Sequence, residues 1–381
     1  MEKIYLDNAA TTPLLEEVIQ EMVESMRAQY GNPSSTHSIG QEAKTKIEAV
    51  RRQVAEALKV QPGEIIFTSC GTESNNMIIK SCVEHLGVER IISSPLEHKC
   101  VAETCLEMKK RKGVDLVYIR PNAHGDIEPE QVEKALKQSD KKTLVSLMHA
   151  NNEIGNLTNI KKIAEICREN GALFHSDTVQ TVAHLDLDFT EIPVDFASCS
   201  AHKFHGPKGA GFAFVRKSSG LKALITGGPQ ERNLRAGTEN VCGIVGLGKA
   251  LEISLNHLED YQKQIQAIKD YAIEQLSAHI PGVKFNGRSA EADQSLYTVL
   301  SVLLPFKNPL LSLQLDMKGI AISQGSACSS GASKPSMVMM MVLDEKEMEQ
   351  TTPLRVSFSH QTTRAEIDAL VKALQEIQAE L

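Results

Sequence analysis

The segment from about residue 40 to residue 180 alternates short apolar runs with amphipathic stretches, and this alternation limits the fold more than any other feature. Short runs without a polar face are typical of strands that are buried on both sides. Stretches with apolar residues at three- and four-residue intervals predict helices with one buried face. The rhythm predicts a mostly parallel sheet covered by helices on both faces. We expect strands within 64–69, 90–95, 115–120, 143–150 and 172–177, and helices within 41–58, 73–86, 100–112, 129–136 and 160–170.

The pattern changes after this alternating segment. Two apolar runs, DFASCSA and GAGFAFVR, follow one another with no helix between them, which predicts an antiparallel excursion of the sheet. A helical pattern from about 241 to 278 is long enough to link two domains. The remaining chain predicts a smaller α+β unit with strands in TVLSVLLP, IAISQGS and PLRVSFS.

The composition excludes several classes of partner. A net charge of -7 and a pI near 6.0 argue against a nucleic-acid surface, which needs clustered basic residues. The densest basic run, KKRK at 109–112, ends an amphipathic pattern and is interpreted as a solvated helix end. No apolar stretch reaches the length of a membrane helix, and the first residues lack the apolar core of a signal peptide. We expect a cytoplasmic protein that binds neither nucleic acid nor membrane.

Eight cysteines are scattered along the chain without a CxxC pair, which argues against a disulfide framework and a zinc site. A metal pair of His202 and His205 is an alternative, but no third ligand stands at a convincing spacing, so we expect no metal. Most cysteines lie in apolar segments and are interpreted as small core residues. Cys328 differs, because GSACSSG (325–331) surrounds it with small, flexible residues. It is either an incidental thiol of a surface loop or a reactive one.

A turn and a strand end carry residues suited to a phosphate. Gly71 and Thr72 lead from a strand into a helix, where backbone N–H groups and the helix dipole favour an anion. A simple helix cap by Thr72 is the alternative interpretation. Ser200 and His202 stand at the end of another strand, directly before Lys203.

A lysine at a strand end inside a pocket must be desolvated or used in chemistry. Lys203 is such a residue, and Asp177 ends a neighbouring strand with Gln180 three residues beyond. A lysine that forms a Schiff base, an acid that keeps a pyridine nitrogen protonated and a phosphate cradle are the requirements of pyridoxal 5'-phosphate (PLP). The sequence therefore favours PLP as cofactor.

Eight ordered motifs together resemble the cysteine desulfurases, the NifS/IscS-like enzymes of the class V aminotransferase group. The resemblance runs from residue 4 to the C-terminal helix. It implies the type I PLP-dependent transferase fold, an α/β fold whose large domain has a mostly parallel seven-stranded sheet, and it implies a homodimer. We expect residues 15–258 to form this domain, and residues 1–14 and 259–381 to form a smaller α+β domain that carries the Cys328 loop. The motifs are YLDNAATTP, YGNPSS, FTSCGTESNN, SPLEHK, NNEIG, SAHKFHGPKGAGF, RAGTEN and GSACSSG.

The resemblance implies roles around the PLP ring. Lys203 would hold PLP as a Schiff base and later act as a base at the substrate's α-carbon. Asp177 would pair with the pyridinium nitrogen, and Gln180 would bond the ring hydroxyl. His98 would stack on the ring and take part in proton transfer.

The resemblance also implies which residues bind the phosphate and the substrate. The phosphate would be held by Gly71, Thr72, Ser200 and His202, with Thr238 reaching it from the partner subunit. Arg355 would bind the substrate carboxylate through a bidentate fork. Asn152 would contact both cofactor and substrate, and Asn32 would lie near the same place.

The implied reaction converts L-cysteine to L-alanine and leaves a persulfide on Cys328. A sulfur-acceptor protein such as an iron–sulfur scaffold, or an enzyme of tRNA thiolation or another sulfur pathway, would then take the sulfur. A mobile loop suits this task, since attack and delivery need access and movement. Two alternatives stay open: a selenocysteine lyase or other PLP-dependent lyase on the same fold, and a non-catalytic scaffold. The presence of Lys203, Asp177 and Cys328 argues against the scaffold.

Three features depart from the family pattern. Thr178 follows Asp177 where alanine is usual, and it would crowd the ring slightly. Pro229 stands where glycine is usual, which leaves that turn undefined. The methionine-rich run MVMMMVL is interpreted as a core-facing helix and not as a ligand site.

Overall fold

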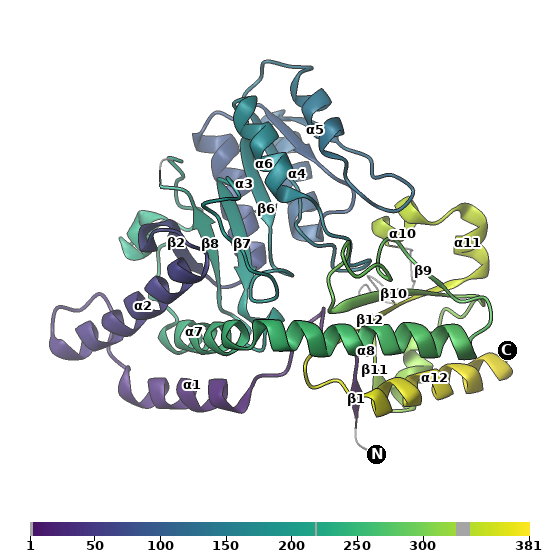
Figure 1. Cartoon of the computed structure of the whole chain (residues 1–381). Helices are drawn as coiled ribbons and strands as arrows, with labels where there is room; N and C mark the ends of the chain where they lie inside the picture. Colours follow the sequence, from purple (N-terminus) through teal and green to yellow (C-terminus); the bar gives the residue numbers. More distant parts are fainter. Residues whose placement is uncertain (1–2, 218, 325–335) are drawn as a thin grey trace.

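The computed structural model describes residues 3–217, 219–324 and 336–381, and Figure 1 shows their arrangement. A sheet with helices on both faces forms the upper part of this view. A long helical rod, α7 (Val241–Asn256) followed by α8 (Leu258–His279), runs beneath it toward a smaller unit that contains the C-terminus. No helix of the described residues is long and apolar enough to cross a membrane.

The large sheet has seven strands in the order β2-β8-β7-β6-β5-β3-β4. Among these strands, β8 alone runs opposite to its neighbours, and its antiparallel pairing with β7 is the excursion that the sequence predicts. The mostly parallel α/β fold is therefore confirmed. The strands are β2 (Ile65–Thr68), β3 (Arg90–Ser93), β4 (Asp115–Tyr118), β5 (Thr143–Ser146), β6 (Leu173–Asp177), β7 (Phe196–Ser200) and β8 (Gly211–Val215).

Successive residues of the strands point to opposite faces, so each face has its own apolar core. Ile65 and Phe67 belong to the larger cluster, while Ile66 belongs to the other. The larger cluster lies under α2 (Ser38–Ala57), α5 (Pro129–Leu136), α6 (Ile160–Glu169) and α7, and α1 (Glu16–Ala28) packs on α7. The opposite face is covered by α3 (Gly71–His85) and α4 (Lys99–Lys112).

The smaller unit has a separate apolar core built on the antiparallel sheet β12-β10-β9. Its helices α8 and α12 pack against each other, and β1 pairs in parallel with β11 beside them. The elements are β1 (Ile4–Tyr5), β9 (Lys284–Phe285), β10 (Val299–Leu304), α9 (Leu311–Met317), β11 (Ile320–Ala321), α10 (Met337–Val342), α11 (Glu345–Gln350), β12 (Thr352–Ser357) and α12 (Arg364–Ala379).

Several details differ from the sequence pattern. The helix expected from 241 to 278 is broken at His257, whose backbone has φ -115° and ψ 14°. The strand expected in IAISQGS is limited to Ile320–Ala321, because its partner β1 is equally short. The helix that ends with KKRK stops as expected, at Gly113 in the left-handed conformation. In the methionine-rich helix α10, Met339 is buried while Met340 is 47% exposed.

The turn at Pro229 is now defined. Pro229 has φ -82° and is followed by three residues with positive φ, Glu231, Arg232 and Asn233. Positive φ is unfavourable for residues other than glycine, so contacts with the surrounding structure must stabilise this turn. The Glu231 carboxylate supplies them, because it accepts two hydrogen bonds of 2.7 Å from Arg51 and one of 2.8 Å from the N–H of Phe67 on the edge strand β2.

Removing Glu231 should destabilise the fold more than removing an exposed carboxylate. The side chains of Arg51 and Glu231 are 3% and 2% exposed, so Glu231→Ala leaves a buried guanidinium whose remaining carboxylate partner is the more exposed Glu48 at 3.0 Å. We expect a loss of about 3 kcal/mol in the free energy of unfolding, measured by urea denaturation. Glu191→Gln, which removes a pair with Lys161 exposed at 67% and 51%, is the control and should change it by less than about 0.5 kcal/mol. Equal losses in the two variants would contradict this role of Glu231.

Candidate active site

The candidate residues gather at the carboxyl edge of the large sheet. Asp177 ends β6 and Ser200 ends β7, its parallel neighbour. Lys203 lies in the short helix η2 (Ala201–Lys203) that follows β7. His98 follows β3 at the start of α4, and Gly71 follows β2 at the start of α3. Ligands collect at this edge in open α/β sheets, because the strand ends bring loops together there.

Lys203 is held in a site that disfavours its charged form. Its Nζ donates hydrogen bonds to the backbone carbonyls of Ala9 (2.6 Å) and Ala10 (2.9 Å). Burial, and then the positive charge of Arg355, lowers the pKa of Lys203 to about 8, against the opposing effect of Asp177. Near neutral pH an amine with such a pKa is neutral in a far larger fraction of molecules than an ordinary lysine, and this neutral form can act as a nucleophile or base.

Asp177 is oriented by a buried chain of hydrogen bonds. Its Oδ2 accepts from Asn75 Nδ2 (2.7 Å), and its Oδ1 accepts from the N–H of Val179 (3.0 Å). The His175 Nε2 lies 3.0 Å from Asn75 Oδ1, and the His175 Nδ1 lies 2.8 Å from Ser146 Oγ. Burial lowers the pKa of His175 to about 4, so the ring is neutral, donates from Nε2 and accepts at Nδ1.

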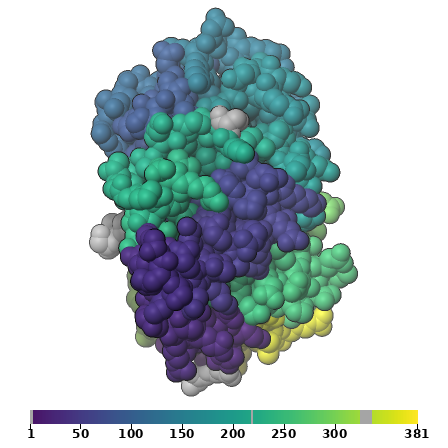
Figure 2. All heavy atoms as spheres, turned by 90° about the vertical axis from the view of Figure 1, so that its left-hand side faces the viewer, coloured from purple at the N-terminus to yellow at the C-terminus, as the bar shows by residue number. Residues whose placement is uncertain are grey.

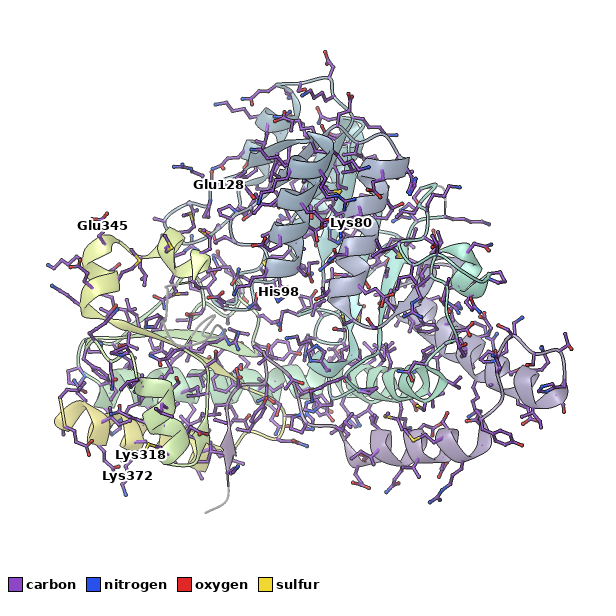
Figure 3. All side chains as sticks on the ribbon, turned by 180° about the vertical axis from the view of Figure 1, so that it is seen from behind. Lys80, His98, Glu128, Lys318, Glu345 and Lys372 are labelled. Atoms are coloured by element: carbon purple, nitrogen blue, oxygen red, sulfur yellow. The ribbon has the colours of Figure 1, made fainter. Side chains whose placement is uncertain are left out.

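His98 caps α4 with its ring. The Nδ1 accepts a hydrogen bond from the N–H of Cys100 (3.3 Å) and lies 3.0 Å from the Cys100 Sγ. Burial lowers the pKa of His98, and Lys203 lowers it further, while Asp177 opposes both. The ring is therefore neutral at neutral pH, with Nδ1 as acceptor and the hydrogen on Nε2. Figure 3 shows His98 near mid-height, between the helices over the sheet and the smaller unit.

The start of α3 has the form of an anion cradle. The N–H of Gly71 donates to Ser200 Oγ (3.0 Å), and Thr72 is exposed on the first turn. A Cβ at Gly71 would lie 2.4 Å from Val179 Cγ2, so glycine is needed for this close approach. Burial lowers the pKa of His202 to about 4, and the neutral ring has its Nδ1 3.2 Å from Thr11 Oγ1.

The N-terminal segment forms one wall of the site, a role that the sequence analysis did not assign. Gln180 is buried and donates from Nε2 to the carbonyl of Ala9 (3.1 Å), which Lys203 also contacts. The hydroxyl of Thr12 donates to the carbonyl of His202 (3.1 Å). The run of small residues in DNAATT was the available signal, because small residues permit close backbone approach. Asn75, His175 and Ser146 were also missed, although polar residues on buried strand and helix faces could have indicated them.

Arg355 reaches the site from β12 in the smaller unit. Its Nη1 donates to the carbonyl of Asn152 (3.0 Å), and its Nη2 donates to Asp7 Oδ1 (2.7 Å). Its Nε is buried and has no hydrogen-bond partner among the described residues. The structure thus brings Arg355 and Asn152 together and leaves one buried donor of the guanidinium unsatisfied among the described residues.

Other predicted site residues are not brought together in one chain. Asn32 is exposed in the α1–α2 connection, and its side chain accepts from the N–H of Ser34 (2.9 Å). Thr238 is exposed in the segment after η3 (Gln230–Asn233). Cys328 lies outside the described residues. Among the residues that are described, no group of three or more His, Cys, Asp or Glu could hold a metal ion.

Thr178 does not crowd the strand end. Its side chain is buried, and its hydroxyl donates to the carbonyl of Ser198 on β7 (2.8 Å). The hydroxyl is thereby satisfied within the sheet, while Val179 lies against Gly71.

The donor set fits PLP. A buried amine of lowered pKa, a buried and oriented carboxylate and a glycine-shaped helix start lie at one edge of the sheet. These are the groups that the aldehyde, the ring nitrogen and the phosphate of PLP require.

Comparisons with known proteins agree with this geometry. The family model for Aminotransferase class-V matches residues 4–370. The cysteine desulfurase IscS of Dictyoglomus turgidum is 38% identical over 378 residues, which cover 98% of this chain and 94% of that relative. A solved NifS-like protein is 35% identical with a TM-score of 0.90, and the match covers 100% of both chains. A structure described as SspA in complex with cysteine is 33% identical with a TM-score of 0.80 and covers 94% of this chain and 100% of its own. The chain therefore belongs to the class-V aminotransferase family, among its cysteine desulfurases.

Proposed function

We propose that this protein is a PLP-dependent cysteine desulfurase that converts L-cysteine to L-alanine and keeps the sulfur as a persulfide. The observation that carries the proposal is the buried Lys203, with its pKa lowered to about 8, within electrostatic reach of both Asp177 and His98. The chain's membership of the cysteine desulfurases and its similarity to a structure solved with cysteine support L-cysteine as the substrate.

Different residues of the chain would bind the phosphate, the aldehyde carbon, the ring nitrogen and the ring hydroxyl of PLP. Gly71, Thr72, Ser200 and His202 would hold the phosphate of PLP, and Lys203 would bind its aldehyde carbon. Asp177 would hold a proton on the ring nitrogen, and the two hydrogen bonds that it accepts fix the orientation of its carboxylate. Gln180 would exchange its bond with Ala9 for the ring hydroxyl. When bound, PLP supplies an electron sink for the pair left on the substrate's α-carbon.

Proton movement falls to Lys203 and His98. The neutral Lys203 amine would take the proton from the α-carbon of the substrate. His98 would stack on the ring, and its Nε2–H would face the reacting groups, because its Nδ1 is held by Cys100.

The substrate would be held by its carboxylate. Arg355 would bind it through its guanidinium, which the carbonyl of Asn152 keeps in place. Asn32 would contribute from the neighbouring subunit.

Cys328 would accept the sulfur. The Cβ–S bond of cysteine would break as the Cys328 thiolate bonds to sulfur, the Cβ would gain a proton and the α-carbon would regain the one that Lys203 took, so that L-alanine and the persulfide result. Cys100 is a poor alternative, because burial raises the pKa of its thiol to about 12. The persulfide would pass to an acceptor protein such as an iron–sulfur scaffold.

We also propose a homodimer. Exposed apolar side chains lie on and after α1, among them Val23 (38%), Met26 (56%) and Tyr30 (73%). Figure 2 shows α1 and α2 together with the segment that follows β8 on one face of the molecule. Asn32 and Thr238 belong to the segments of this face, so a partner seated here would receive them in its own site.

The domain division stays a proposal: residues 15–258 form the PLP-binding domain, and residues 1–14 with 259–381 form the smaller domain. Two separate apolar cores support it, although Val338 and Met339 of the C-terminal part pack in the larger one. A cytoplasmic location is likewise proposed, on composition alone.

Cys328→Ala tests the function. Wild-type protein with L-cysteine should release alanine and gain the mass of one sulfur atom on the peptide that carries Cys328, whereas the variant should do neither. Its PLP absorption should be unchanged, because Lys203 and Asp177 are intact. Alanine release from L-cysteine by the variant at the wild-type rate would instead support a lyase that needs no cysteine nucleophile, and alanine from selenocysteine alone would support the desulfurase.

The uptake of PLP should depend on pH through Lys203. Since the neutral amine reacts, the rate of PLP uptake by the apo-protein should rise as pH increases through about 8, followed by absorbance. Arg355→Gln removes a positive charge that lowers the pKa of Lys203, so the inflection should move to higher pH. The rate at which PLP reacts with Nα-acetyl-lysine, measured over the same pH range, provides the correction for the titration of PLP itself. A corrected profile without an inflection between pH 7 and 9 would contradict the assignment.

Asn75→Leu should weaken PLP binding. The change keeps the size of the side chain but removes the donor to Asp177 and the acceptor for His175. A hydrogen bond to a charged group is worth about 1.5–3 kcal/mol, so the dissociation constant of PLP should rise about tenfold or more. Asn76→Leu is the matched control, since Asn76 bonds only the carbonyl of Thr72 in its own helix. Equal PLP affinity in the two variants would rule out the role of Asn75.

A further inference from the structure

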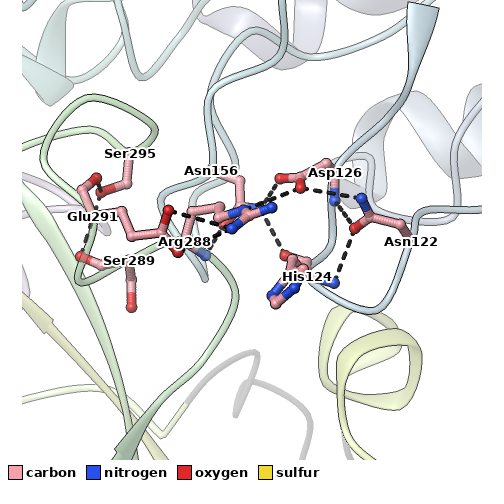
Figure 4. A network of polar contacts seen from close by, with 8 residues as sticks. All are labelled: Asn122, His124, Asp126, Asn156, Arg288, Ser289, Glu291 and Ser295. Carbon is pink, nitrogen blue, oxygen red and sulfur yellow. Dashed lines mark hydrogen bonds and ion pairs between the residues drawn. The ribbon is translucent and has the colours of Figure 1, made fainter.

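A polar cluster outside the cofactor site joins the two halves of the chain (Figure 4). At its centre, Asn156 is 4% exposed and uses both ends of its amide. Its Nδ2 donates to the carbonyl of His124 (2.8 Å) and to Asp126 Oδ1 (2.8 Å), and its Oδ1 accepts from the N–H of Arg288 (2.8 Å). Because both acceptors lie on one side and the donor on the other, the amide orientation is fixed.

Asp126 and Arg288 close the cluster. Arg288 Nε donates to Asp126 Oδ2 (3.1 Å), between side chains that are only 23% and 25% exposed. Asn122 donates to the same carboxylate oxygen (3.2 Å) and accepts from the N–H groups of His124 and Asp126. We call Asn156, Asp126 and Arg288 the clamp. It joins the β4–α5 connection, the loop after β5 and the loop after β9.

The backbone is shaped to admit this cluster. Gly287 has φ +62°, and a Cβ on it would lie 2.5 Å from Asn156 Oδ1. Only glycine permits both this conformation and this approach.

On one side, the clamp holds the turn that carries Asn152. This turn runs from Asn151 to Asn156 and is closed by hydrogen bonds from Asn151 N to Asn156 O (3.0 Å) and from Gly155 N to Asn151 O (2.9 Å). The carbonyl of Asn152 within it accepts the hydrogen bond from Arg355 Nη1. Fixing Asn156 therefore fixes the acceptor that orients the guanidinium.

On the other side, the clamp holds the approach to Arg355 itself. Asn156 forms an antiparallel bridge with Ser295, and Leu296 N donates to the carbonyl of Gly155 (2.8 Å). The chain then continues into β10, where Ser301 pairs with Arg355 of β12. The two ends of the contact between Asn152 and Arg355 are thus tied to the same three residues.

We propose that the clamp is a positioning device that sets the guanidinium of Arg355 for the carboxylate of the amino-acid substrate. The inference rests on the proposed function, in which Arg355 binds that carboxylate. The clamp touches neither substrate nor PLP, so it acts on substrate affinity and leaves cofactor binding alone.

Asn156→Ala removes all three side-chain bonds of the clamp's centre. We expect the KM for L-cysteine and the dissociation constant of L-alanine to rise by a similar factor of about ten, because a small displacement of a bidentate donor costs much of its binding. The kcat should change less than about threefold, and the PLP absorption and affinity should not change. L-Alanine binding, followed by the absorbance of bound PLP, reports carboxylate binding without turnover.

A double-mutant cycle with Arg355→Gln separates positioning from general destabilisation. If the clamp acts through Arg355, adding Asn156→Ala to Arg355→Gln should raise the dissociation constant of L-alanine no further. Additive effects, or a wild-type affinity for L-alanine in Asn156→Ala, would overturn the inference. Failure of the wild type to release alanine from L-cysteine would refute the proposed function alone, since L-alanine binding still tests the clamp.

Glu291→Gln is the matched control. This change removes the ion pair between Arg288 and Glu291 (3.1 Å), and the Glu291 side chain is 45% exposed. It leaves the hydrogen bonds of Asp126 and Asn156 in place. It should bind L-alanine as the wild type does, and a weakening equal to that of Asn156→Ala would contradict the inference. If Asn156→Ala fails to fold, Asp126→Asn can replace it, because it removes the charge opposite Arg288 without changing the size of the side chain. This variant should show the same loss of L-alanine affinity. An unchanged affinity would contradict the role of the clamp.

Discussion

The buried amine of Lys203 is the constraint on which the rest of the site depends. Removing an ammonium group from water costs several kcal/mol unless other groups replace its hydration. Here the Nζ is given two backbone carbonyls, those of Ala9 and Ala10, and no carboxylate within hydrogen-bonding distance among the described residues. Carbonyls compensate the charge only in part, so the pKa falls to about 8 and the amine becomes reactive. The pKa of this lysine is thus lowered by burial and not by a special partner.

The N-terminal segment makes that burial possible and also ties the two halves of the molecule. It carries the carbonyls that meet Lys203 and, two residues earlier, Asp7, which pairs with Arg355 of the smaller unit. The same segment is joined to β12 through the bond from Ser357 N to the carbonyl of Leu6 (2.9 Å). A displacement of the smaller unit would therefore also shift the carbonyls around the Lys203 amine, because the N-terminal segment contacts both Arg355 and Lys203. The clamp around Asn156 limits such displacement from the opposite side of the site.

The sequence predicted what depends on local pattern. Every strand of the large sheet was expected within a few residues, since buried runs and amphipathic helices are encoded locally. The positions of Asp177 at the end of β6 and of Lys203 just after β7 were also predicted, because they depend on where each strand ends. The left-handed turn at Glu231 could not be predicted, because a buried partner far along the chain, Arg51, stabilises it. The clamp joins residues 126, 156 and 288, and no spacing in the sequence relates them.

The state of Arg355 shows how the site is prepared for a ligand. Two of its nitrogens are engaged, by Asn152 and Asp7, while the buried Nε lacks a partner among the described residues. A buried polar group without a hydrogen bond costs about 1–3 kcal/mol, and more when it is charged. A carboxylate could satisfy that donor only if the groups that cover it moved, and part of its binding free energy would then be the relief of a cost already present in the folded chain. The ion pair with Asp7, whose side chain is 25% exposed, meanwhile prevents the guanidinium from standing uncompensated. Binding is thereby favoured for an anion of the right shape, while the fold keeps its charge balance before the anion arrives.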